Sequence, residues 1–123
     1  MPVNVLVVDD QEPFRRVAGM VVDSTEGFDL AGLAATGEEG VEAVRRLHPD
    51  LVLMDVNLPG IDGIEATRRI LAEAPATVVL LLSTYEAAEY ERRASECGAG
   101  AFLPKSEFGP ERLAQAWQEF PSR

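Results

Sequence analysis

The chain has 123 residues, of which 21 are acidic and 11 are basic, so its formal net charge at pH 7 is −10. This length suits a single folded domain, residues 1–123, with one continuous fold and no second unit. The excess of negative charge argues against direct contact with nucleic acid or with an anionic membrane surface. It favours cations or basic protein surfaces as partners.

The sequence contains nothing that resembles a signal peptide, and no apolar stretch approaches the roughly 20 residues of a membrane-spanning helix. We therefore expect a cytoplasmic protein without a membrane partner. The single cysteine, Cys97, cannot form an internal disulfide. Its position within an expected amphipathic helix predicts a packing role.

Five short runs rich in Val and Leu predict strands that are buried on both faces, as in a parallel sheet. In chain order the runs are Val3–Val8, Phe28–Ala34, Leu51–Met54, Val78–Leu82 and Ala101–Leu103.

Each strand is followed by a segment in which apolar residues recur at three- and four-residue spacing, which predicts a helix. The helical segments are residues 14–22, 41–47 and 64–71, then about 86–97 and 110–118. Thr36-Gly37 marks a helix start, while Pro49, Pro75 and Gly98 mark helix ends. Five alternations of strand and helix predict an α/β fold with a doubly wound, five-stranded parallel sheet and five helices.

Ligands of such sheets bind beyond the carboxyl ends of the strands. The first and third apolar runs deliver Asp9, Asp10 and Asp55 to these ends. Clustered carboxylates lose hydration and repel one another unless a cation compensates. With hard oxygen ligands and no Cys or His nearby in sequence, Mg²⁺ is favoured over Zn²⁺. Taken alone, Asp9 or Asp10 could equally be a helix N-cap.

A hydroxyl pair, Ser83 and Thr84, follows the fourth run, and Lys105 follows the fifth. A carboxylate nucleophile with a metal, a hydroxyl and an ammonium group beside it is the set that phosphoryl transfer requires. The pattern predicts an acyl phosphate on Asp55. Lys105 could instead be a solvated loop residue, and the two hydroxyls could merely satisfy a strand end.

Three segments, VLVVDD, PDLVLMDVNLPGIDG and FLPKS, closely resemble the receiver domain of two-component response regulators, and the resemblance covers essentially the whole chain. The matching residues occur in the family's order. The intervals also fit, with 28 positions from Asp55 to Ser83 and 22 from Ser83 to Lys105. The resemblance implies a flavodoxin-like fold with strand order 2-1-3-4-5.

The resemblance also implies individual roles. Asp55 would accept the phosphoryl group from a sensor histidine kinase. Asp55 and Asp10 would be direct Mg²⁺ ligands, Asp9 would be a ligand through water, and the main-chain carbonyl of Asn57 would be a further one.

After transfer, Ser83 would donate a hydrogen bond to a phosphoryl oxygen and Lys105 would pair with another. Thr84 is the alternative switch hydroxyl, but the family intervals favour Ser83. Phe102 matches an aromatic residue that swings inward when the hydroxyl moves, although a phenylalanine on a strand is more often a core residue.

Some positions depart from the common family pattern. Thr84 replaces a smaller residue and would narrow access to Asp55, and Ser106 follows Lys105 where many receivers have a cis proline. Asn57 and Tyr85 occupy the two positions that tune attack of water on the phosphoryl group. We hypothesise that Tyr85 crowds this water and lengthens the phosphorylated lifetime. His48 is expected to be a surface residue without a role in the chemistry.

Two other functions compete with this interpretation. A dehalogenase-like phosphohydrolase carries a second aspartate two residues after the nucleophile as its general acid, and here that position is Asn57. An unphosphorylated interaction module would not need the intact set of Asp55, Ser83 and Lys105. We therefore expect a phosphoacceptor switch, which catalyses only its own phosphorylation and slow dephosphorylation, and not an enzyme.

Residues 83–90, STYEAAEY, are most similar to receivers attached to helix-turn-helix DNA-binding domains of the LuxR/NarL type. This implies control of transcription through a separate output domain. The surface formed by the fourth helix, fifth strand and fifth helix would change shape on phosphorylation, and a homodimer could form through it.

Overall fold

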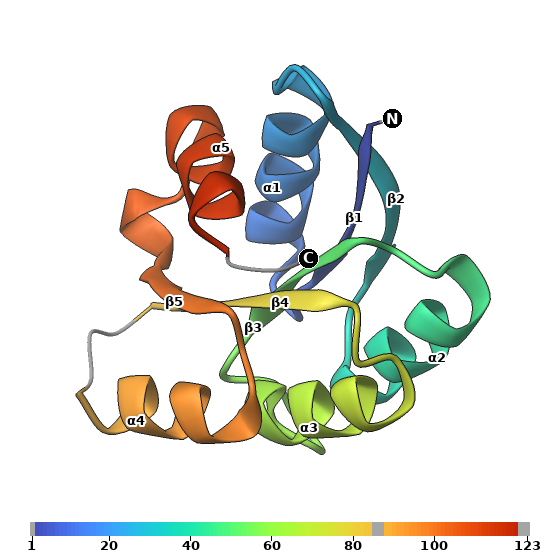
Figure 1. Ribbon diagram of the computed structural model, residues 1–123, viewed down its shortest axis with the longest axis vertical. Helices are drawn as coiled ribbons and strands as arrows, with labels where there is room; N and C mark the ends of the chain where they lie inside the picture. The colour runs from blue at the N-terminus through green and yellow to red at the C-terminus, as the bar shows by residue number, and fades with distance from the viewer. Residues whose placement is uncertain (1, 85–87, 121–123) are drawn as a thin grey trace.

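The computed structural model contains one twisted sheet of five parallel strands with helices on both faces (Figure 1). It describes residues 2–84 and 88–120. The strands are β1 (Val3–Val8), β2 (Phe28–Ala34), β3 (Leu51–Asp55), β4 (Val78–Ser83) and β5 (Ala101–Pro104). Their order across the sheet is β2-β1-β3-β4-β5 and each neighbouring pair is parallel, which confirms the predicted topology.

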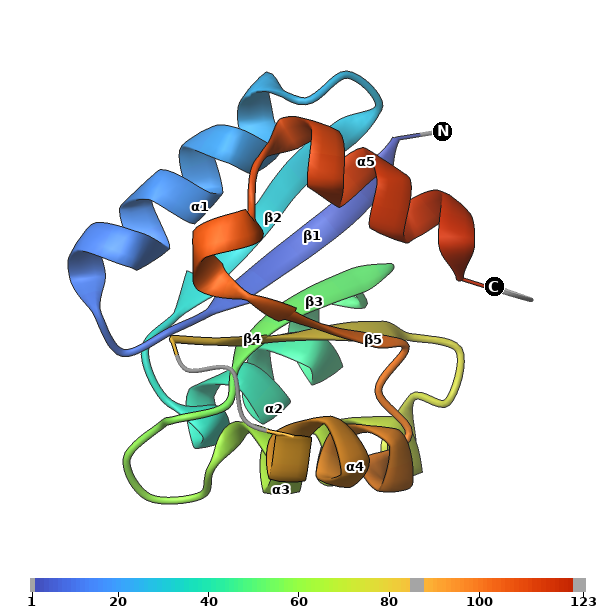
Figure 2. The same cartoon turned by 90° about the vertical axis from the view of Figure 1, so that its left-hand side faces the viewer.

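The helices lie in two layers, with α1 and α5 on one face of the sheet and α2, α3 and α4 on the other (Figure 2). Their bounds are α1 (Glu12–Ser24), α2 (Gly37–Leu47), α3 (Gly63–Glu73), α4 (Ala88–Cys97) and α5 (Pro110–Glu119). A short 3-10 turn, η1 (Lys105–Glu107), joins β5 to α5. The start predicted for the fourth helix, Glu86, falls outside the described residues. Within 2–84 and 88–120, none of the helices has the length and apolar character needed to cross a bilayer.

Burial on both faces explains why the strands are apolar throughout. In β1, Val5 and Val7 point toward α1 and α5, whereas Leu6 and Val8 point toward α2 and α3. All four side chains are at most 1% exposed. Burying one such side chain contributes roughly 1.5–3 kcal/mol. Cys97 is also buried in the core on the α2–α4 side, as its predicted packing role requires.

The helix boundaries follow the predicted capping signals. Thr36 caps α2, because its hydroxyl oxygen accepts a hydrogen bond from the amide of Glu39 at 3.0 Å. The exposed His48 follows α2 with φ of 49°, and Gly98 follows α4 with φ of 95°. The residue that precedes α1 is Gln11, so neither Asp9 nor Asp10 is a helix N-cap.

Aromatic rings pack together at the amino end of the sheet. The ring of Trp117 on α5 makes edge-to-face contacts with Phe28, at 6.5 Å between centroids, and with Phe120, at 5.8 Å. Phe28 is the first residue of β2 and pairs with Val3, the first residue of β1. The contacts therefore tie the end of α5 to the edge of the sheet where the strands begin.

The start of α3 lies directly against the backbone of Asp55. Asp62 caps the helix by accepting a hydrogen bond from the amide of Glu65 at 2.8 Å, and the amide of Gly63 donates to the carbonyl of Val56 at 2.9 Å. A Cβ atom on Gly63 would overlap the main-chain carbonyl of Asp55. Glycine is therefore required here by close backbone contact.

We expect Gly63→Ala to lower the free energy of unfolding by about 1–3 kcal/mol, because the added methyl group must displace backbone. Urea denaturation would measure the change. Gly109→Ala is the control, since a Cβ there meets nothing within 4 Å. Because Gly109 is the N-cap of α5, where alanine is less favourable than glycine, we expect this control to lose only about 0.5 kcal/mol. Equal effects of the two substitutions would contradict the proposed overlap.

Candidate functional site

Three aspartates gather at the carboxyl edge of the sheet. Asp9 directly follows β1, and Asp55 is the last residue of β3, the neighbouring strand. One carboxylate oxygen from each of Asp9, Asp10 and Asp55 lies within 4.8 Å of the other two. Asp9 and Asp55 are only 1% and 3% exposed, whereas Asp10 is exposed. The predicted cluster therefore forms, with one carboxylate open to solvent.

Lys105 reaches into this cluster from the end of β5. Its Nζ lies 2.7 Å from Oδ2 of Asp9 and 3.4 Å from Oδ2 of Asp55, and its side chain is 9% exposed. The alternative interpretation of Lys105 as a solvated loop residue is therefore wrong. Among the described residues, neither Lys105 Nζ nor Asp9 Oδ2 has a partner in hydrogen-bond geometry, so charge attraction holds the pair.

The surrounding charges and the burial of the site shift the pKa of the Asp55 carboxyl. Burial and, to a smaller extent, the nearby charge of Asp9 raise the pKa of its carboxyl, Lys105 lowers it, and the resulting pKa is about 6. Loss of hydration and repulsion between carboxylates thus outweigh one ammonium group. A further cation would offset the remaining negative charge.

The side chains present fit Mg²⁺. Three hard carboxylate ligands converge, the cluster includes no Cys or His, and Oδ2 of Asp9 is buried without a hydrogen bond among the described residues. Oxygen-only ligands are those that Mg²⁺ prefers. Asn57 lies two residues beyond Asp55. Its main-chain amide donates a hydrogen bond to Oδ1 of Asp55 at 3.2 Å, and its side chain is exposed.

The remaining predicted site residues lie on β4 and β5. Ser83 is fully buried and pairs with Pro104, the residue before Lys105, whereas Thr84 is exposed. Phe102 is half-buried and packs against the core on the α2–α4 side of the sheet. Lys105 and Ser106 begin the turn η1, and no peptide bond within the described residues is cis. Tyr85 lies outside the described residues.

Sequence reasoning missed two contacts of the site. The guanidinium of Arg15 donates a hydrogen bond to the carbonyl of Asp9 at 2.7 Å, and the ring centroid of Phe14 lies 4.6 Å from Nζ of Lys105. Helical spacing assigned Phe14 correctly to the inner face of α1. Helical spacing alone cannot show that the Phe14 ring contacts the ammonium group of Lys105.

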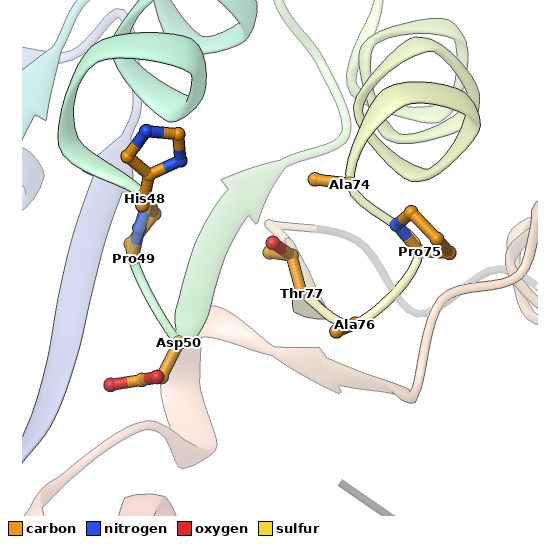
Figure 3. A pocket seen from close by; sticks show the side chains of 7 residues that line it. All are labelled: His48, Pro49, Asp50, Ala74, Pro75, Ala76 and Thr77. Carbon is orange, nitrogen blue, oxygen red and sulfur yellow. The ribbon is translucent and has the colours of Figure 1, made fainter.

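The opposite end of the sheet has a different character. A depression there is lined by the turn from α2 to β3, residues 48–50, and the turn from α3 to β4, residues 74–77 (Figure 3). Both turns precede strands, so the depression lies at the amino ends. It shares no residue with the carboxylate cluster.

Comparison with known proteins identifies the family. A family model described as the response regulator receiver domain matches residues 5–118. The chain belongs to this family. Receiver domains are phosphoacceptor switches of two-component systems, phosphorylated by sensor histidine kinases, and they bind Mg²⁺ at an acidic cluster such as that of Asp9, Asp10 and Asp55.

Solved receiver structures superpose closely on this one. The LuxR-family response regulator of Aurantimonas is 30% identical with a TM-score of 0.88, over 96% of this receiver and 84% of that chain. The response regulator domain of Thermotoga maritima CheB is 32% identical with a TM-score of 0.87, over 98% and 97% of the two chains.

Curated relatives include a protein-glutamate methylesterase/protein-glutamine glutaminase of Hahella chejuensis, which is 43% identical over 107 residues. The match covers 86% of this receiver and 28% of the relative. A homologous enzyme of Syntrophus aciditrophicus is 40% identical, over 84% and 30% of the two chains. The chain thus spans less than a third of the length of these relatives.

The raised pKa of Asp55 makes stability depend on pH. Because the carboxyl binds its proton more tightly in the folded state, with a pKa of about 6 against 3.8, stability falls as pH rises between these values. In the presence of a chelator, we expect Asp55→Asn to be more stable than the wild type at pH 7.5, by about 1–3 kcal/mol. The difference should vanish near the lower of the two pKa values.

Urea denaturation as a function of pH would measure this difference. Asp29→Asn, which removes an exposed carboxylate at the start of β2, is the control and should show no such pH-dependent gain. An Asp55→Asn protein that is no more stable than the wild type at pH 7.5 would contradict the raised pKa.

Proposed function

We propose that residues 1–123 form one receiver unit in which Asp55 accepts a phosphoryl group from the phosphohistidine of a sensor histidine kinase. A carboxylate oxygen of Asp55 forms the new bond to phosphorus. The bond between phosphorus and the imidazole nitrogen breaks, and its electron pair stays with that nitrogen. The observation that carries the proposal is that the Lys105 ammonium and the carboxylates of Asp9 and Asp10 converge on the buried Asp55.

Asp10, Asp55 and the main-chain carbonyl of Asn57 would hold Mg²⁺, with Asp9 acting through water. When bound, the ion neutralises negative charge on the attacking and transferred oxygens. Lys105 supplies the second positive charge, and its Nζ already lies 3.4 Å from the carboxylate that would carry the phosphoryl group. The exposed Asp10 leaves one side of the cluster open for the phosphoryl donor.

We propose Ser83 as the switch hydroxyl. It is buried and lies beside β5, whereas Thr84 points to solvent and would narrow the approach to Asp55. Movement of the Ser83 hydroxyl toward a phosphoryl oxygen would leave space for Phe102 to swing inward. The surface of α4, β5 and α5 would change with it, and this surface would pass the signal on.

The burial of Lys105 disfavours the competing functions. A module that is never phosphorylated gains nothing from burying an ammonium group against two carboxylates, since such pairs rarely increase stability. A dehalogenase-like hydrolase needs a general acid at the position of Asn57, and the side-chain carboxamide of asparagine cannot act as one. The protein would therefore promote only its own phosphorylation and slow dephosphorylation.

The output of the switch is proposed to be transcription, through a helix-turn-helix domain like those that accompany LuxR-family receivers. The methylesterase relatives support a second output, control of a catalytic domain.

Because histidine kinases use ATP, we expect the reaction to occur in the cytoplasm. We also propose a homodimer through α4, β5 and α5, and sedimentation as a monomer with Mg²⁺ and beryllofluoride at high concentration would contradict it.

Incubation with acetyl phosphate, followed by intact-mass measurement, tests the phosphoacceptor role. We expect a gain of one phosphoryl group (about 80 Da) that requires both Mg²⁺ and Asp55. Asp55→Asn should abolish the gain and Asp10→Asn should reduce it, whereas the exposed control Asp29→Asn should behave as the wild type. No gain in the wild-type protein would support the unphosphorylated module.

The lifetime of the acyl phosphate tests the role proposed for Tyr85. If its side chain crowds the attacking water, Tyr85→Ala should increase the dephosphorylation rate by a few-fold, on the order of 0.5–1 kcal/mol of activation free energy. The rate would be followed by loss of the phosphorylated mass after the phosphoryl donor is removed. An unchanged rate in Tyr85→Ala would show that Tyr85 does not limit hydrolysis.

A further inference from the structure

The ammonium group of Lys105 has an aromatic neighbour as well as two carboxylates. Its Nζ lies 4.6 Å from the ring centroid of Phe14, within the range of a cation–π contact. The Lys105 side chain is 9% exposed, so water screens this contact weakly. Among the described residues Nζ has no partner in hydrogen-bond geometry, so directional bonds do not fix its position.

The ring of Phe14 is itself held in place. It packs against Phe108, which follows η1, with 6.2 Å between ring centroids and a 52° tilt. The first turn of α1 is tied to the acidic loop, because Arg15 donates to the carbonyl of Asp9 and the amide of Gln11 donates to Oδ1 of Asp9. Phe14 thus connects the loop that carries Asp9 with the segment that carries Lys105.

We propose that Phe14 is a positioning residue that keeps the Lys105 ammonium beside Asp55 during phosphoryl transfer. The inference rests on the proposed function. In that reaction Asp9 would help to hold Mg²⁺, and this would weaken its attraction for Lys105 when the ammonium must meet a phosphoryl oxygen. The ring of Phe14 carries no charge and holds no metal. Its attraction for the ammonium therefore persists throughout the transfer.

The test replaces Phe14 with phenylalanine analogues that carry one, two or three ring fluorines. Fluorination weakens the negative face of the ring while its shape changes little. We expect the rate of phosphorylation by acetyl phosphate, at saturating Mg²⁺, to fall stepwise along the series. Phe14→Leu should lower it by about threefold to tenfold, and Phe14→Tyr should retain the wild-type rate.

The same series in a Lys105→Met background separates positioning from general packing. If Phe14 acts through the ammonium, fluorination should leave the residual rate of that variant unchanged. Phe28→Leu is the matched control, because it removes a buried phenylalanine at the amino end of the sheet. It should lower stability and leave the phosphorylation rate as in the wild type.

The outcomes are distinct. A wild-type protein that is phosphorylated at the same rate as all the fluorinated forms would overturn the role of Phe14 and leave the proposed function standing. A stepwise fall that persists equally in the Lys105→Met background would also overturn it, because the ring would then act without the ammonium. A wild-type protein that takes up no phosphoryl group would overturn the proposed function and this inference together.

Discussion

The fold must accommodate three charged side chains that are almost completely withdrawn from water, Asp9, Asp55 and Lys105. Removing Lys105 alone would leave two buried carboxylates facing each other, and removing Asp9 would take away the carboxylate nearest the ammonium group, at 2.7 Å. Unpaired buried charges cost several kcal/mol. The three side chains come from β1, β3 and the end of β5. The Lys105 ammonium can attract both carboxylates only when these strands are in register. The formation of the site therefore depends on the formation of the sheet.

The rest of the architecture supplies that register. The apolar side chains of the strands anchor both helix layers, so the sheet is fixed from two sides and its carboxyl edge is left free for polar groups. Local contacts then set the positions of individual atoms. Asp9 is held through its carbonyl by Arg15 and through Oδ1 by Gln11, and Gly63 allows α3 to start against the backbone of Asp55. Precision at the site comes from these short-range contacts and stability comes from the core.

Much of this could be predicted from the sequence, for a physical reason. Strands buried on both faces must be apolar at every position, and helices that cover them must repeat their apolar residues, so Val3–Val8 and Phe14 to Val22 were informative by themselves. The carboxyl-edge rule then brought Asp9, Asp55 and Lys105 together. Contacts between side chains that are distant in sequence carry no such pattern. The ring of Phe14 above Lys105 and the close approach of Gly63 to Asp55 depend on packing angles, which spacing alone does not encode.

The aromatic contacts at the amino end have a practical consequence for spectroscopy. Trp117 is the only tryptophan of the chain, and its ring lies between Phe28 and Phe120. A six-residue strand such as β1 spans roughly 20 Å, so the indole is separated from the carboxylates by about the length of the sheet. Its emission is too remote to be quenched directly by chemistry at Asp55. Any fluorescence change that accompanies phosphorylation would therefore record a rearrangement that has reached the far end of the domain.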